Sequence, residues 1–128
     1  MTVRPILKLG NPKLYEVCSP VAEEEFDSLG PLIADLRDTM MDFRARMDAG
    51  RAISAPQIGV MKRLVYMHID EPVVFINPRL VDRSTVRMTL WDDCMSFPEL
   101  LVRVRRHRSC RIVYRDVDWQ KRSMDLRC

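Results

Sequence analysis

The spacing of hydrophobic residues changes near Gly50, and this change constrains the fold more than any other feature of the sequence. Over residues 29–47, hydrophobic side chains recur at steps of three and four residues, which predicts an amphipathic helix. Asp27 or Ser28 can cap its start, and Pro31 is tolerated in its first turn. Gly50 is placed to end it. The hydrophobic stripe consists of Leu32, Ile33, Leu36, Met40, Phe43 and Met47.

Beyond the Gly50 segment the pattern becomes that of short strands. Brief runs of β-branched and aromatic residues are separated by residues that favour turns, at positions 70–72, 77–78 and 116–120. The predicted strands cover residues 63–69, 73–76, 84–90, 100–105 and 109–114. One long helix packed on several short antiparallel strands predicts an α+β fold.

The composition fits one globular domain that spans residues 1–128. The chain is 47% hydrophobic and 30% charged, and nothing in it suggests a linker, an internal repeat, a secretory signal or a membrane span. Its four cysteines show no C-x-x-C spacing. We therefore expect reduced thiols in a cytoplasmic or organellar compartment.

A cluster of basic residues between positions 103 and 111 raises the alternative of nucleic-acid binding. The cations alternate with Val102, Val104, Cys110 and Ile112, which is typical of a strand with one solvated face, and no aromatic stacking platform is interleaved with them. A solvated basic face is therefore favoured over a nucleic-acid site. The cluster comprises Arg103, Arg105, Arg106, His107, Arg108 and Arg111.

Two segments carry residues suited to chemistry. Residues 50–59 form a helix exit and a compact loop, in which the Gln57 amide can donate to a carbonyl oxygen on which negative charge develops. Spacing alone favours a structural connection here. Cys94 follows Asp92 and Asp93. Neighbouring carboxylates oppose thiolate formation and a metal promotes it, so a metal-ligand role is favoured over a nucleophile, with a buried small hydrophobe as the alternative.

A catalytic divalent metal needs about three protein ligands and an open position. His68 lies in an apolar predicted strand and His107 in a basic one, and they lack the four-residue spacing that places two imidazoles on one helix face. Each is expected to be a structural or surface histidine. The sequence therefore offers Cys94 without a complete set of ligands.

Residues 50–57 (GRAISAPQ) and 91–96 (WDDCMS) resemble, in order, the first two signature motifs of the peptide deformylase family, G-x-G-(aliphatic)-A-A-P-Q and W-E-G-C-L-S. The similarity extends to the opening at positions 5–14, to the Ile-Asn-Pro at 76–78 and to the strand region 102–116. It therefore covers essentially the whole chain.

The resemblance implies a hydrolase that removes the formyl group from the N-formylmethionine of nascent polypeptides, using Fe²⁺ or Zn²⁺. It makes Cys94 a metal ligand, and it makes Gln57 and the backbone N–H of Met95 donors to the oxyanion formed when metal-bound hydroxide attacks the formyl carbon. The residues implied to hold the substrate are Gly50, Ala52 and Ile53. An N-formylmethionyl peptide is the implied partner, and ribosome association is a further expectation, whereas no specific nucleic acid and no membrane are expected.

The sequence departs from the family pattern at several positions. Ala52 and Asp93 replace usual glycines, Ser54 a usual alanine, Met95 a usual leucine and Asp92 a usual glutamate. Ala52 and Asp93 each add a Cβ, which is expected to narrow the substrate groove or to demand a backbone conformation that glycine adopts more easily.

The third family motif, a helical H-E-x-x-H that completes the metal site and provides the general base, is absent from the 128 residues. The chain stops in what resembles the strand leading to that helix. We therefore expect a truncated domain that lacks its C-terminal catalytic helix, is inactive by itself and self-associates through uncovered apolar surface. The alternative is a non-catalytic module that binds peptide N-termini or a partner protein.

Overall fold

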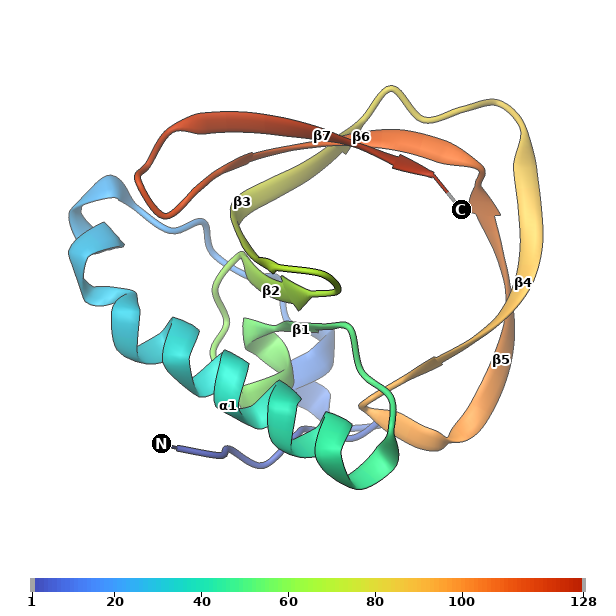
Figure 1. Cartoon of the computed structure of the whole chain (residues 1–128), viewed down its shortest axis with the longest axis horizontal. Helices are drawn as coiled ribbons and strands as arrows, with labels where there is room; N and C mark the ends of the chain where they lie inside the picture. The colour runs from blue at the N-terminus through green and yellow to red at the C-terminus, as the bar shows by residue number, and fades with distance from the viewer. Residues whose placement is uncertain (1, 128) are drawn as a thin grey trace.

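The computed structural model describes residues 2–127 and shows one long helix together with antiparallel strands (Figure 1). Two 3-10 helices, η1 (Pro12–Tyr15) and η2 (Glu23–Ser28), precede the long helix α1 (Gly30–Met47). Strand β1 (Ala52–Ser54) leads into a third 3-10 helix, η3 (Ala55–Ile58). The remaining strands are β2 (Leu64–His68), β3 (Pro72–Val81), β4 (Arg87–Cys94), β5 (Phe97–His107), β6 (Ser109–Arg115) and β7 (Lys121–Arg127). The α+β prediction is confirmed.

The strands form two separate sheets. Five of them pair in the order β1-β2-β3-β6-β7, and every pair is antiparallel. The β4–β5 hairpin forms the second sheet and arches away from the first, whereas α1 lies beside β1 and β2 (Figure 1). Along residues 2–127, no helix combines the length and the apolar character needed to span a membrane.

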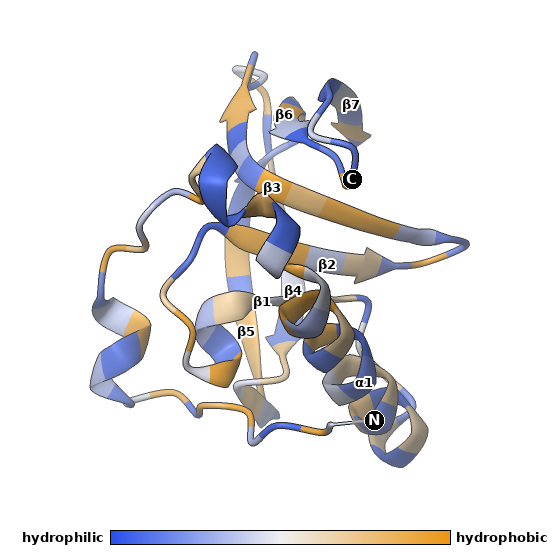
Figure 2. Ribbon diagram, turned by 90° about the vertical axis from the view of Figure 1, so that its left-hand side faces the viewer, coloured by the Kyte–Doolittle hydropathy of each residue, from blue (hydrophilic) through white to orange (hydrophobic). Residues whose placement is uncertain are grey.

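The core lies between α1 and the first three strands. Leu36 and Met40 of α1 are fully buried, and they belong to one cluster with Ile53 of β1, Leu64 of β2 and Ile76 of β3. Strands β2 and β3 consist largely of hydrophobic residues (Figure 2). The period of three and four residues thus identified the buried face of the helix correctly.

Both ends of α1 differ from the prediction. The residue that precedes the helix is Leu29, because Asp27 and Ser28 are part of η2, where the Ser28 hydroxyl donates to Glu25 O (2.7 Å). At the other end Asp48 takes the left-handed C-cap position (φ 52°), which aspartate tolerates better than most residues. Gly50 therefore does not end the helix, but lies two residues beyond its cap.

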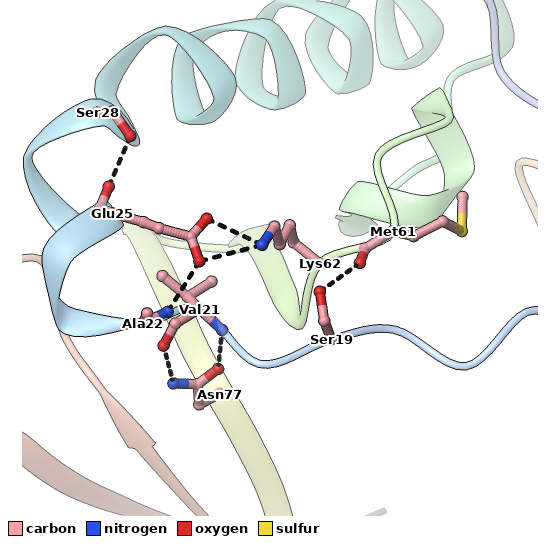
Figure 3. A network of polar contacts seen from close by, with 8 residues as sticks. All are labelled: Ser19, Val21, Ala22, Glu25, Ser28, Met61, Lys62 and Asn77. Atoms are coloured by element: carbon pink, nitrogen blue, oxygen red, sulfur yellow. Dashed lines mark hydrogen bonds and ion pairs between the residues drawn. The ribbon is translucent and has the colours of Figure 1, made fainter.

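Strand β3 continues through the predicted turn at Asn77-Pro78. A register shift between Ile76 and Arg79 accommodates these residues as a bulge, in which Asn77 has a φ of 51°. The Asn77 side chain accepts from Val21 N (2.8 Å) and donates to Val21 O (2.9 Å), so its amide acts as a strand-like partner for the N-terminal segment (Figure 3). The turn prediction was wrong because the bulge absorbs the proline inside a longer strand.

The same N-terminal segment is held by charge. The carboxylate of Glu25 lies 2.9 Å from Lys62 Nζ and also accepts a hydrogen bond from Ala22 N (Figure 3). These two interactions, with the Lys62 hydrogen bond first, hold the pKa of Glu25 below its ordinary value. Residues 19–25 are thereby fastened to the linker before β2 and to the β3 bulge.

Candidate functional site

Gln57 is fixed by the turn that contains it. Its Oε1 accepts hydrogen bonds from Ser54 N (2.9 Å) and Ser54 Oγ (3.2 Å) across η3. A backbone N–H can only donate, so this contact also determines which end of the amide is oxygen. The Nε2 end must therefore point away from Ser54, toward the tip of the β4–β5 hairpin.

The hairpin tip brings Cys94 to that amide. Cys94 and Phe97 close a two-residue turn formed by Met95 and Ser96. Gln57 Nε2 lies 3.5 Å from Cys94 Sγ and donates to Ser96 Oγ at 3.1 Å, and Ser96 N approaches the same sulfur at 3.5 Å. The two sequence motifs, which are far apart in the chain, thus meet at one position.

Met95 contributes its main chain and its side chain in different directions. Its side chain is buried, with 5% exposed, and packs toward Gly50. Its N–H belongs to a turn residue and lies outside the β4–β5 ladder. The N-terminal segment supports this turn, because Leu9 N donates to Ser96 O (2.9 Å) and Leu7 N donates to Gln57 O (2.7 Å).

Gly50 occupies a place that only glycine suits. Its φ is 119°, and a Cβ at this position would lie 3.3 Å from Phe43 Cδ1 and 3.7 Å from Met95 Cε. Arg44 of α1 ties this linker down, since its Nε donates to Gly50 O (3.0 Å) and its Nη2 donates to His68 O. The residue predicted to stop the helix instead allows the hairpin tip to approach α1.

A pocket of about 270 Å³ lies between α1, the linker before β1 and the hairpin tip. Phe43 and Met47 form its helical wall, and Pro98 closes another side. Met47 was predicted to be a core residue, but it is 45% exposed because the last turn of α1 faces this pocket rather than the sheet. The pocket is also lined by Gly50, Ala52, Asp92, Asp93, Cys94 and Met95.

β1 presents a free edge to the pocket, because it is the first strand of the sheet. His68 N donates to Arg51 O (2.8 Å), so Ala52, which lies opposite Met67, belongs to a non-hydrogen-bonded pair. The N–H and C=O of Ala52 therefore point outward, toward that edge. Ile53 has 1% of its surface exposed and belongs to the core, so its side chain does not line the pocket.

Ala52 and Asp93, which stand where the family usually has glycine, cause no backbone strain. Neither Ala52 nor Asp93 has a positive φ. Ala52 adopts an extended conformation within β1, and Asp93 lies at a register shift near the end of β4, where its N–H bonds to Asp92 Oδ1 (2.9 Å). Asp92 in turn pairs with Arg106 across the hairpin at 2.5 Å. The expected demand for a glycine conformation is therefore wrong, because neither residue has a positive φ.

The residues present do not complete a metal site. Among residues 2–127, no group of three or more His, Cys, Asp or Glu side chains could hold a metal ion. His68 Nδ1 lies 3.2 Å from Tyr66 Oη, and burial raises the pKa of that tyrosine. His107 Nδ1 lies 2.7 Å from Ser84 O, and neither histidine lines the pocket. Cys94 carries a free thiol, as do Cys18 and Cys110.

Sequence reasoning overlooked three contributors to this site. Ser54 and Ser96 orient Gln57 from its two ends, and Phe43 provides a wall of the pocket. Both serines lie within the two motifs, but Ser96 meets its partner Gln57 from a distant part of the chain. Phe43 carries the periodic signal of a core residue, and it is buried as that signal predicted.

Comparisons with known proteins agree on one family. The polypeptide deformylase family model matches residues 3–127. A "peptide deformylase-like" protein of Brucella melitensis is 35% identical over 121 residues, which cover 92% of this chain and 70% of that protein. The crystal structure of peptide deformylase from Thermotoga maritima has a TM-score of 0.89 at 25% identity, covering 100% of this chain and 84% of the other. A peptide deformylase from Legionella pneumophila has a TM-score of 0.88 at 30% identity, covering 99% and 73%.

Proposed function

This chain belongs to the polypeptide deformylase family, and we propose that it is a peptide deformylase-like hydrolase whose 128 residues are inactive by themselves. The observation that carries this proposal is the contact of Gln57 with Cys94, which lines a pocket to which no histidine contributes. The family reaction is metal-dependent hydrolysis of the formamide bond. The residues that recognise substrate are present, whereas those that activate water are not among residues 2–127.

Peptide recognition would begin at β1. An extended peptide can add to the free edge of a sheet through main-chain hydrogen bonds, and the outward N–H and C=O of Ala52 are available for this. The first side chain would enter the pocket beside Phe43, Met47 and Met95. A methionine side chain fits such a place, because an unbranched thioether adapts to irregular apolar walls.

The formyl group would then lie near the hairpin tip. Gln57 Nε2 and the N–H of Met95 would donate to its carbonyl oxygen, in the manner of an oxyanion hole. Both N–H groups of Nε2 are directed at Cys94 and Ser96 here, so binding requires that Gln57 release one of these contacts. One sulfur is too few ligands for a catalytic Fe²⁺ or Zn²⁺, so these residues bind and orient the substrate rather than cleave it.

The activity of the purified 128-residue chain tests this function. Formylmethionyl-peptide hydrolysis, followed by release of formate after incubation with Fe²⁺ or Zn²⁺, is expected to stay at the background rate. Metal analysis after gel filtration should find well below one ion per chain, with a further decrease in Cys94→Ala. Robust turnover with stoichiometric metal would refute the inactivity of this chain.

The second candidate is a binding module without enzymatic activity, which the free β1 edge and the adjoining apolar pocket favour. Calorimetry should then detect saturable binding of a formylmethionyl peptide, with weaker binding of the unformylated peptide. Ala52→Pro removes one outward donor without removing a bond to β2, and it should weaken binding. If no heat of binding appears at about 1 mM peptide, the hypothesis of a binding module is wrong.

Other partners belong to the same proposal. The bacterial relatives of this chain support a cytoplasmic location. Recognition of nascent chains would place the protein at the ribosome. Co-sedimentation with ribosomes can test this. Self-association would use the hairpin, where Trp91 is 63% and Leu101 60% exposed. Sedimentation velocity should show oligomers that decrease in Leu101→Ser. A monodisperse monomer at high concentration would exclude self-association.

A further inference from the structure

A second concave surface lies on the five-stranded sheet, away from the candidate site. Its volume is about 760 Å³, and it is formed by the start of β2, the β3 bulge and the β6–β7 hairpin. Arg79 lies opposite Val113, and Arg115 lies opposite Lys121, so these residues share one face of the sheet. We call this surface the basic groove. Its cationic residues are Arg63, Arg79, Arg115, Lys121 and Arg122.

In the part of the chain that the structure describes, no carboxylate lines the basic groove. One of its five cations, Arg122, forms an ion pair, with Asp116 at 2.8 Å. Among the described residues 2–127, Arg79 and Lys121 form no ion pair. The residues that line the groove therefore carry an excess of positive charge.

Two of the cations are held in place by neutral partners. Arg63 Nε donates to Cys18 O (3.1 Å), and Arg115 Nη1 donates to Trp119 O (2.9 Å) while its guanidinium lies over the Trp119 ring. Backbone carbonyls orient a guanidinium without cancelling its charge. The remaining N–H groups of these arginines are thus positioned to meet an anion, with less side-chain entropy to lose on binding.

The backbone beneath the groove is rigid as well. The bulge at Asn77-Pro78 sets the direction of β3 just before Arg79, and the two Asn77 hydrogen bonds to Val21 fix that bulge. Bulges commonly serve to redirect a side chain. The fold therefore fixes the position of the Arg79 backbone beside the two arginines that are held by carbonyl oxygens.

We propose that the basic groove binds the phosphodiester backbone of nucleic acid without reading its sequence. Guanidinium groups match phosphate geometry, and neutralising phosphates releases counterions. The groove is lined by separate strands rather than enclosed, which suits a continuous chain of phosphates better than a small phosphate ester. Its one aromatic lining residue, Tyr114, packs edge-on against Phe75 at 4.7 Å and is not free to stack on bases.

This site is distinct from the basic cluster on β5, and it does not depend on the proposed peptide function. In β5, Arg103 and Arg105 lie on an exposed face beside Trp91 and Thr89. They form a second positive surface that also could attract a polyanion. The two surfaces can be separated by charge reversal of matched pairs of residues.

The test is fluorescence anisotropy with a labelled single-stranded RNA of about 16 nucleotides at low salt. Wild type should bind, with log K falling against log salt by about 0.7 for each phosphate neutralised. Arg79→Glu/Lys121→Glu should weaken binding at least tenfold and flatten the slope, whereas Arg103→Glu/Arg105→Glu, which changes the net charge equally, should keep at least a third of the affinity. Circular dichroism of both double variants should match that of wild type.

The proposal would be overturned by no binding by wild type at low salt, by unchanged affinity in the groove variant, or by an equal loss in the β5 variant. Competition separates the sources of phosphate. Duplex DNA should displace the RNA, since both share a phosphodiester backbone. A protein that binds short-chain polyphosphate or vesicles with anionic lipids, but not the RNA, would also contradict the proposal.

Discussion

The α1–sheet layer and the β4–β5 hairpin are built on different principles, although both reach the same pocket. In the layer, Leu36, Met40 and Ile76 have none of their surface exposed. In the hairpin, exposed residues alternate with half-buried ones along β4, and no residue of β4 or β5 is buried. The layer is a packed core, whereas the hairpin is a two-stranded ribbon with both faces uncovered by the described chain.

This difference divides the candidate site into two parts: a firm half, which is fixed against the core, and a dependent half, which is held by a few contacts of the hairpin tip. Gln57 and Gly50 belong to segments fixed against the core. Cys94 is carried by the hairpin tip, which is fastened by the Gln57 amide and by Leu9 N bound to Ser96 O. A two-stranded ribbon is marginally stable in isolation, so these few bonds decide whether the two halves meet.

The same substitution in the two regions gives the largest expected contrast. Leu36→Ala creates a cavity in a fully buried site and should lower the free energy of unfolding by about 2–5 kcal/mol. Leu90→Ala in β4 removes a half-buried side chain and should cost about 1 kcal/mol. Urea unfolding monitored by circular dichroism measures both. Equal losses would mean that the hairpin packs as a core does.

Gly50 tests how tightly the hairpin tip packs on α1. Gly50→Ala adds a Cβ 3.3 Å from Phe43 Cδ1 at a φ of 119°, and it should cost about 1–3 kcal/mol and displace Met95. Gly10→Ala is the matched control, because Gly10 has a φ of 98° but no heavy atom within 4 Å of the added Cβ. Thermal unfolding should therefore show a smaller loss for Gly10. Identical losses of stability in the two variants would mean that backbone strain, and not the contact with Phe43, is the whole cause.

The helix and its buried face could be predicted because they depend on local spacing. Residues 29–47 contain α1 almost to the residue, and the stripe correctly included Leu36, Met40 and Phe43. The predicted ends of α1 were wrong because capping depends on single hydrogen bonds. Ser28 bonds to Glu25 within η2 instead of capping α1, and Asp48 takes the C-terminal position that was expected for Gly50. Local rules identify an element better than its limits.

The geometry of the site could not be predicted from such local rules. The sequence could name Gln57 and Cys94 through the family resemblance, but their separation of 37 positions hides the contact between them. The role of Ser96 as a partner of Gln57 was hidden for the same reason, and so was the proximity of Arg79 to Lys121 in the basic groove. Spacing within one strand does not say which strands become neighbours, because strand order depends on tertiary packing.

Removing the Gln57 amide should loosen the hairpin tip. Gln57→Ala loses the hydrogen bond to Ser96 and the contact with Cys94, and it should cost about 1–2 kcal/mol. Alkylation of Cys94, localised by mass spectrometry, should accelerate relative to that of Cys110. Ser54→Ala is the milder control, since Ser54 N still donates to the amide (2.9 Å). Unchanged Cys94 labelling in Gln57→Ala would show that the N-terminal segment alone holds the tip.

The ion pair of Glu25 with Lys62 is expected to have the smallest effect on stability, and it lies outside the β4–β5 hairpin. Because the Lys62 hydrogen bond lowers the pKa of Glu25, the carboxylate stabilises the fold above the ordinary pKa of glutamate, and this contribution is lost as the pH falls through the lowered value. Wild type should therefore exceed Glu25→Gln in melting temperature at about pH 7, and the difference should disappear as the pH falls through the lowered pKa of Glu25.

A control in the same 3-10 helix separates this pair from general charge effects. Glu23→Gln removes an equal charge from η2 at a residue that forms no ion pair among residues 2–127, and its melting temperature should follow wild type across the titration. If Glu25→Gln also follows wild type, the N-terminal segment is held by Asn77 and Val21 rather than by charge.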